Sequence, residues 1–341
     1  MIFRSRAPLR LGLAGGGTDV SPFSEIYGGN ILNATISLYA SCSIEPNTSG
    51  RIQLVSIDRH ESIELESQTS LSINGLLDLA KGVYNRVVLD FIGEPLSFKL
   101  TTFVDAPAGS GLGSSSTLTV AVLSAFAAWK GLPLGEYDMA HLAHAIERVD
   151  LGWAGGKQDQ YAATFGGFNF MEFGGNDKVI VNPLRIRGDL VRELETNVVL
   201  YYMGTSRLSG QIIQTQSENV SSGNEKSLEG MQKLKEQAVL MKEAILKGNL
   251  CDIGPLLDFG WKYKKQTSNV ISNVLIDEIY DAALAAGATG GKISGAGGGG
   301  FMMFFCPGNT RYKVIERLKV FGGEFRRFQF VETGAVSWCA K

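Results

Sequence analysis

Strands dominate the pattern at the start of the chain. Apolar and polar side chains roughly alternate there, often with β-branched residues, and the side chains of a strand point alternately to its two faces. Farther on, apolar residues recur at helical spacing from Leu76 to Phe91, ahead of Gly93, and this spacing predicts a helix. The four expected strands are Ile2–Leu13, Asn30–Ile44, Arg51–Ile57 and Ser62–Leu65.

The rest of the chain mixes expected strands with expected helices. The strands are Leu96–Val104, Phe168–Phe173, Val179–Val181, Thr196–Met203, Phe301–Cys306 and Phe325–Val331. The helices are Leu118–Trp129, Glu136–Val149, Ser227–Lys247, Leu256–Thr267, Ile276–Ala286 and Thr310–Val320. Because the character of the pattern changes around residues 185–195, we expect an α+β fold in two domains, residues 1–190 and 191–341.

Composition narrows the class of protein. The 341 residues are 44% hydrophobic and 19% charged, with a net charge of −2, which fits a soluble globular protein without a basic footprint for nucleic acid. No apolar stretch is long enough for a membrane span, and the first residues lack a signal-peptide core. The four cysteines are widely spaced, which speaks against disulfides or a zinc site, so we expect a cytoplasmic protein.

The most informative stretch is a glycine-rich loop between an expected strand and an expected helix. Its glycines leave the backbone open to a ligand, and its serines fall where a helix start exposes unpaired N–H groups. Free amides and the positive end of a helix dipole form an anion site, for which phosphate is the usual ligand. An ordinary capped turn is the less favoured alternative. The loop residues are Pro107, Gly109, Ser110, Gly111, Leu112, Gly113, Ser114, Ser115 and Ser116.

Two familiar phosphate-binding patterns do not fit this loop. A dinucleotide-binding fingerprint, G-x-G-x-x-G, would place its third glycine at Ser114. A Walker loop needs Ser or Thr after a Gly-Lys pair, and neither Gly156-Lys157 nor Gly291-Lys292 is followed by one. The loop therefore belongs to a third type of phosphate binder.

Three more glycine clusters mark candidate functional segments, at residues 14–19, 152–160 and 292–300. Before the second of them, His141, His144 and Glu147 lie three residues apart on one face of an expected helix. A metal site is conceivable there, but packing or surface roles are the preferred interpretation of the two histidines.

The glycine clusters together resemble the signature motifs of the GHMP small-molecule kinases. The three matching segments are Pro8-Leu9-Arg10 with its glycine turn, Pro107–Ser115 and Lys292–Gly299. Arg10 followed by residues 15–19 is similar to the sugar-kinase branch. Residues 81–85 and 155–170 are most similar to the branch that acts on D-glycero-D-manno-heptose 7-phosphate. The resemblance implies an N-terminal domain like ribosomal protein S5 domain 2, a ferredoxin-like C-terminal domain and an active site between them.

The resemblance also implies roles for the matching residues. Asp159 would be the general base, with Arg10 beside the transferred phosphoryl group, and the loop at residues 107–116 would wrap the ATP phosphates. Ser115 and Glu147 would bind Mg²⁺. The sugar site would comprise Gly16, Gly17, Thr18, Asp19, Gly156 and Lys157, and the wall behind the loop Ser294, Gly295, Gly297 and Gly298.

The implied reaction is ATP-dependent phosphorylation of the anomeric oxygen of the heptose 7-phosphate, giving the 1,7-bisphosphate used for nucleotide-activated heptose. Phosphoryl transfer requires positioning and charge neutralisation, and Mg²⁺ prefers oxygen ligands. An anomeric hydroxyl is unusually acidic for an alcohol, so a carboxylate can take its proton, and Arg10 would keep Asp159 ionised. The distal phosphate needs a second cationic pocket, for which the candidates are Arg4, Arg6, Lys157 and Lys262–Lys265.

Other interpretations stay open. Taken alone, Asp19 or Asp159 could serve a turn, and Glu147 could be a solvated helix charge. A galactose- or fucose-type kinase and a sugar- and ATP-binding sensor without turnover are alternatives, although a sensor would not need a base. A nicotinamide dehydrogenase is a weaker one. The anomer formed and the oligomeric state, a homodimer included, are left open.

Overall fold

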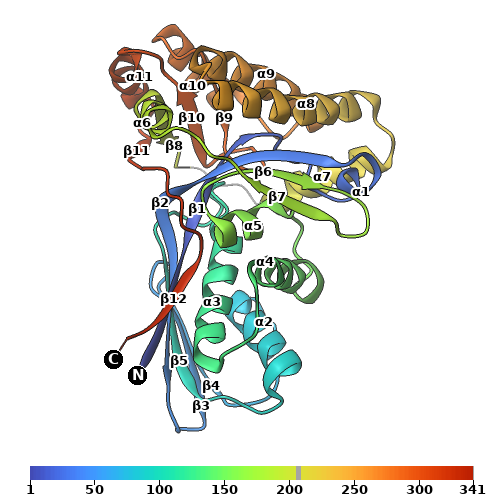
Figure 1. Cartoon of the computed structure of the whole chain (residues 1–341), viewed down its shortest axis with the longest axis vertical. Helices are drawn as coiled ribbons and strands as arrows, with labels where there is room; N and C mark the ends of the chain where they lie inside the picture. The colour runs from blue at the N-terminus through green and yellow to red at the C-terminus, as the bar shows by residue number, and fades with distance from the viewer. Residues whose placement is uncertain (205–208, 341) are drawn as a thin grey trace.

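The computed structural model, which describes residues 1–204 and 209–340, has two lobes, each built around a β-sheet (Figure 1). The first sheet runs in the order β12-β1-β2-β5-β3-β4, and only its β3–β5 pair is parallel. Strand β2 is long enough to pair with β6 through its first residues and with β5 through its last, and β7 extends the sheet beyond β6. These strands are β1 (Ile2–Ala14), β2 (Gly29–Pro46), β3 (Arg51–Ser56), β4 (Glu61–Glu66), β5 (Phe98–Val104), β6 (Phe168–Phe173), β7 (Val179–Pro183) and β12 (Val336–Ala340).

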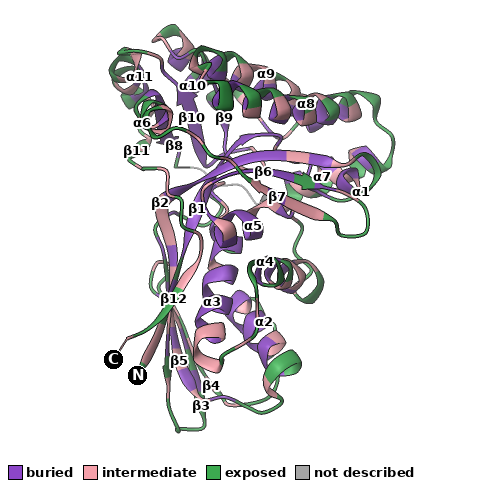
Figure 2. Cartoon of the chain, in the orientation of Figure 1, coloured by how far each residue is buried: buried purple, intermediate pink, exposed green. Residues whose placement is uncertain are grey.

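Helix α3 is the central helix of the first lobe. It contacts β1 and β2 on one side and α2, α4 and α5 on others, and it is buried along most of its length (Figure 2). Two π-helical turns, η1 and η2, continue α2 and α4. The helical segments of this lobe are α1 (Phe23–Tyr27), α2 (Asp78–Val87), η1 (Val88–Ile92), α3 (Ser114–Lys130), α4 (Glu136–Ala145), η2 (Ile146–Asp150) and α5 (Gln158–Phe165).

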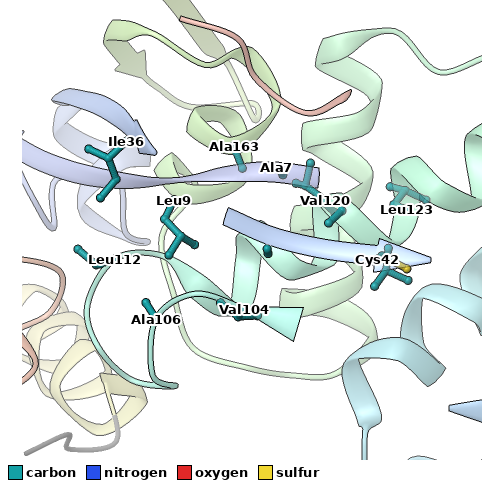
Figure 3. Close-up of a cluster of buried hydrophobic side chains, with 14 of the residues drawn as sticks. Ala7, Leu9, Ile36, Cys42, Val104, Ala106, Leu112, Val120, Leu123 and Ala163 are labelled. Atoms are coloured by element: carbon teal, nitrogen blue, oxygen red, sulfur yellow. The ribbon is translucent and has the colours of Figure 1, made fainter. Parts of the chain in front are cut away.

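A buried apolar cluster anchors the glycine-rich loop to this lobe. Leu9 of β1, Leu112 of the loop and Val120 of α3 belong to it, and all three are fully buried (Figure 3). The loop therefore combines an open backbone with an apolar side chain inserted into the core.

The second lobe is built on a four-stranded antiparallel sheet. Its order, β11-β8-β10-β9, is 4-1-3-2 in chain order, the arrangement of the ferredoxin-like domain that the sequence predicted. Its strands are β8 (Val198–Tyr202), β9 (Gly290–Ile293), β10 (Phe301–Phe305) and β11 (Glu324–Arg326). Its helical segments are α6 (Gly188–Asn197), α7 (Ser209–Ser221), α8 (Glu225–Lys247), η3 (Leu250–Asp252), α9 (Ile253–Thr267), α10 (Val274–Ala285), α11 (Thr310–Leu318) and η4 (Lys319–Phe321).

The end of the chain returns to the first lobe. Strand β12 pairs antiparallel with β1, placing Ala340 opposite Ile2, so both termini lie at the same end of the molecule (Figure 1). The strand expected at Phe325–Val331 is divided: β11 ends at Arg326, and Phe330 bridges to Ile36 of β2. The second lobe therefore ends before residue 341, because the last strand completes the first sheet. None of the helices in the described part of the chain is long and apolar enough to cross a membrane.

Candidate active site

A cleft of about 780 Å³ lies between the two lobes, lined by the glycine-rich loop, η2, α5, α7, α9 and the glycine turn after β1. It brings together most of the residues that the sequence singled out, and Ser115 and Asp159 line the same cavity. The predicted residues on its surface are Arg10, Gly17, Asp19, Gly109, Gly111, Gly113, Ser114, Ser115, Ser116, Glu147, Gly156, Asp159 and Gly295.

The loop holds open the N-terminus of α3. Gly109, Gly111 and Gly113 adopt positive φ angles of 71°, 84° and 77°, a conformation that other residues rarely take. Gly113 is the N-cap of α3, and no side chain caps the helix. The first N–H groups of α3 are thus free to donate to an anion. Pro107 begins the loop, and its carbonyl accepts a hydrogen bond from the N–H of the buried Ser110.

The segment after β9 forms a wall directly behind the loop. The Ser294 hydroxyl donates to the Gly111 carbonyl (2.8 Å), and the Phe301 N–H donates to the Ser110 carbonyl (2.9 Å). A Cβ on Gly295 would lie 2.8 Å from the Cα of Gly111, so the two backbones touch. Gly297 and Gly298 lie farther back, where the Gly298 N–H donates to the Ile271 carbonyl (2.8 Å).

The buried Arg10 forms an ion pair with the partly exposed Asp159 beside this loop. The Arg10 side chain is 4% exposed, and its Nε and one terminal nitrogen both lie 2.7 Å from Oδ1 of Asp159. The other terminal nitrogen donates to the Gly111 carbonyl (2.6 Å). A Cβ on Gly113 would lie 3.2 Å from Oδ2 of Asp159, so this carboxylate faces the first turn of α3.

Glu147 lies in the π-helical turn η2, buried at the edge of the cleft. It accepts hydrogen bonds from the Ser116 hydroxyl (2.9 Å) and from Nε2 of Gln160 (3.1 Å), and burial raises the pKa of its carboxyl group. Ser115, the residue before Ser116 in the chain, is exposed and lines the same cleft. A carboxylate and a hydroxyl are oxygen donors of the kind that a hard cation prefers. The spacing of the two histidines with Glu147 yields no metal cluster, since no group of three His, Cys, Asp or Glu in the described chain is arranged to hold one.

Asp19 is a second buried carboxylate of the cleft, and it lies against the start of α5. It accepts a hydrogen bond from the backbone N–H of Gln158 (3.0 Å), and burial raises its pKa. Gly156 touches it so closely that any side chain there would overlap Asp19. Thr18 is not among the cleft-lining residues, and its hydroxyl instead bonds the carbonyls of Gly15 in the turn and of Asn30 in β2 (both 2.9 Å).

Three of the basic candidates for a distal phosphate lie away from the cleft. Lys157, predicted from the sequence to lie in the sugar site, pairs with Asp177 (2.9 Å) and is not among the cleft-lining residues. The structure therefore does not bring its ammonium group to the cleft. Arg6 lies over the ring of Tyr39, and Arg4 is exposed on β1.

Within the basic stretch of α9, only the middle lysine reaches the cleft. Lys262 and Lys265 form ion pairs with Asp258 and Asp277. Lys264 is 6% exposed, and its ammonium donates to the Gly16 carbonyl (2.9 Å), which is how Gly16 contributes to the site. The helical spacing of Lys264 from the apolar Leu257 and Trp261 could have revealed its inward position.

Several residues around the cleft were not predicted as functional, and four of them contact key groups of the site. Gln158 and Gln160 flank Asp159 and hold the two buried carboxylates; their place within the matched segment was the available signal. Arg148 follows Glu147 and binds the carbonyls of the 152–156 loop. Lys292 donates to the Gly12 carbonyl (2.9 Å), and burial lowers its pKa to about 7.

Comparison with known proteins agrees with this architecture. Residues 78–167 match the family model of the GHMP kinases N-terminal domain, and residues 241–322 match that of the GHMP kinases C-terminal domain. A D-glycero-alpha-D-manno-heptose 7-phosphate kinase of Campylobacter jejuni is 48% identical over 335 residues, covering 98% of each chain.

Solved structures share the fold over nearly the whole length. A structure described as a D-glycero-D-manno-heptose 1-phosphate kinase from Bacteroides thetaiotaomicron is 47% identical, with a TM-score of 0.85 and 99% of each chain covered. Lactococcus lactis galactokinase in complex with galactose is 19% identical and has a TM-score of 0.78, covering 98% of this chain and 95% of its own, which shows the fold alone. The two domain matches and the extended identity show that the chain belongs to the GHMP kinases, a family of ATP-dependent phosphotransferases.

Proposed function

We propose that this kinase transfers the γ-phosphoryl group of ATP to the anomeric hydroxyl of D-glycero-D-manno-heptose 7-phosphate. The observation that carries the proposal is the position of the Asp159 carboxylate beside Gly113, at the uncapped N-terminus of α3. An anion-binding backbone and a candidate base thus face one point of a single cleft. An acceptor hydroxyl at that point would meet both the base and the phosphate.

The loop and the first turn of α3 would bind the ATP phosphates through their backbone N–H groups. Contacts from Ser294 and Gly295 support the loop from behind, so its donors are held in place before the nucleotide arrives. Donors that do not have to reorient as charge develops lower the barrier more than flexible ones.

Asp159 would take the proton of the acceptor. Both contacts from Arg10 go to Oδ1, so we assign Oδ2, which faces Gly113, to the acceptor hydroxyl. The guanidinium fixes the orientation of the carboxylate and offsets negative charge that develops during transfer.

Mg²⁺ fits the oxygen donors at the edge of the cleft, with Glu147 and Ser115 as its proposed ligands. The ion would neutralise charge on the nucleotide phosphates. The chain's own contribution is to hold the buried carboxylate of Glu147 in place through Ser116 and Gln160.

The choice of sugar is supported by the relatives. The Campylobacter protein is named for the heptose 7-phosphate, whereas the Bacteroides structure is named for the heptose 1-phosphate. Phosphorylation of either compound at its other end would give the same 1,7-bisphosphate. We favour the 7-phosphate because a lone carboxylate suits the more acidic anomeric hydroxyl, and the product would then supply nucleotide-activated heptose synthesis.

A substrate panel tests the proposal. ADP release is measured with heptose 7-phosphate, heptose 1-phosphate, galactose and fucose, and the position of the new phosphate is read by ³¹P and ¹³C NMR. The proposal expects the highest kcat/KM with heptose 7-phosphate and a new phosphate on C1. A preference for galactose, fucose or the 1-phosphate would overturn the substrate but keep the kinase, and ATP binding without any ADP release would favour the sensor.

A further inference from the structure

Among the residues that the structure describes, three cationic side chains line the cleft, and they differ in their partners. Arg10 pairs with Asp159, and Arg148 lies 3.4 Å from a Glu147 oxygen. Lys264 takes part in none of the ion pairs found in the described part of the chain, and its ammonium bonds only the Gly16 carbonyl. Asp19 is the carboxylate that acts on this ammonium electrostatically, but it does not lie within ion-pair distance, so a positive charge in the cleft wall has no direct anionic partner among the described residues.

Because Lys264 is buried, the absence of a direct anionic partner lowers the stability of the folded protein. The Lys264 side chain crosses from α9 of the second lobe to the glycine turn of the first, where a Cβ on Gly17 would lie 2.9 Å from its Nζ. Removing an ammonium group from water destabilises the protein unless an anion or several hydrogen bonds compensate. Burial lowers the pKa of Lys264 to about 8, which is a consequence of the same cost. An anionic ligand in the cleft would supply the missing partner.

A series of contacts links the base, Asp159, to Lys264 and indicates where such an anion would lie. Asp159 adjoins Gln158, whose N–H donates to Asp19. Asp19 in turn follows the turn at Gly16 and Gly17 that receives Lys264. Asp19 thus separates the base from the ammonium group, and a sugar spanning the cleft would place one end at each.

We propose that Lys264 binds the phosphate group that the sugar substrate already carries. This inference rests on the proposed function, and the chemistry matches it, because C1 and C7 are opposite ends of a heptose. The acceptor hydroxyl meets Asp159 in the first lobe, and the phosphate meets Lys264 of the second. A dianionic phosphate beside an ammonium forms charge-assisted hydrogen bonds, which a neutral hydroxymethyl group would not.

The test compares two sugars in three variants. Steady-state kcat/KM is measured for heptose 7-phosphate and for unphosphorylated heptose, with Lys264→Met, Lys264→Arg and Lys262→Met. Lys262 is the matched control, since it lies on the same helix, is 67% exposed and pairs with Asp258. Lys264→Met should reduce the preference for the phosphorylated sugar about 10- to 100-fold, with KM for ATP unchanged as the check on folding. Lys264→Arg should retain part of the preference, and the control all of it.

Two results would overturn the inference in distinguishable ways. A wild-type preference for heptose 7-phosphate that survives in Lys264→Met would refute the role of Lys264 and leave the proposed function standing. A wild-type enzyme without any preference for the phosphorylated sugar would refute the proposed function, and the role of Lys264 with it.

Discussion

The wall behind the phosphate loop can be tested by adding one methyl group to it, with Gly295→Ala. Gly295 has a φ of 80°, so alanine there costs about 1–2 kcal/mol in backbone strain. The new Cβ would lie 2.8 Å from the Cα of Gly111, and ordinary contact begins near 3.4 Å, so the loop and wall must separate by the difference of 0.6 Å. The bonds that Gly111 accepts from Arg10 and Ser294 would lengthen as a result.

We expect this shift to reduce catalysis more than stability. A misplacement of 1 Å in an active site can cost about 100-fold, so a shift of this size should lower kcat/KM for ATP by about tenfold or more. Gly131→Ala is the matched control: Gly131 caps the other end of α3 with a φ of 65°, and no atom lies within 4 Å of its added Cβ. The Gly131→Ala variant should lose a similar free energy of unfolding but keep the wild-type kcat/KM for ATP.

The assays are ADP release at varied ATP concentration and urea unfolding of both variants. If Gly295→Ala and Gly131→Ala lost equal stability and both retained wild-type kcat/KM for ATP, the wall would have no part in positioning the loop. A loss of kcat/KM confined to Gly295→Ala would support the assignment.

Two further predictions concern buried charges. Glu147→Gln should raise the Mg²⁺ concentration for half-maximal activity about tenfold or more, because an amide lacks the charge of the carboxylate. An unchanged Mg²⁺ requirement would show that Glu147 is not a ligand of the ion. Lys292→Met should raise the melting temperature most at or below pH 7 and less at about pH 9. The folded-state pKa of Lys292, about 7, lies below its ordinary 10.5, so the cost of burial is fully present below pH 7 and falls as pH rises. A melting-temperature difference that is independent of pH, relative to Lys262→Met, would contradict this reasoning.

The sequence predicted those parts of the fold and site that local chemistry determines. Alternation located β1 and β2 within two residues, and the glycine pattern identified the loop, because both depend on neighbouring residues. Helix α3 begins at Ser114, earlier than its apolar run indicated, since the helix start belongs to the loop. The juxtaposition of Arg10 with Asp159 came from family resemblance, and the structure places the pair in contact.

The remaining features depend on contacts between distant segments. Val336–Ala340 is a short strand with mostly exposed side chains, so only its pairing with β1 defines it. Helix α5 is short and starts inside a glycine cluster, where propensity indicates a loop. Helical spacing distinguishes Lys264 from the other two lysines of α9 as the inward one, but only packing against the first lobe places it at the cleft.

The central claim, that Asp159 acts as a base on an acceptor beside loop-bound ATP, is tested most directly by one variant, Asp159→Asn. Turnover and ATP affinity are measured together, by ADP release with heptose 7-phosphate and by calorimetric titration with a non-hydrolysable ATP analogue. The account predicts a kcat about 10²- to 10⁴-fold lower with a nucleotide Kd close to that of the wild type. A kcat near the wild-type value, with the nucleotide still bound, would contradict it.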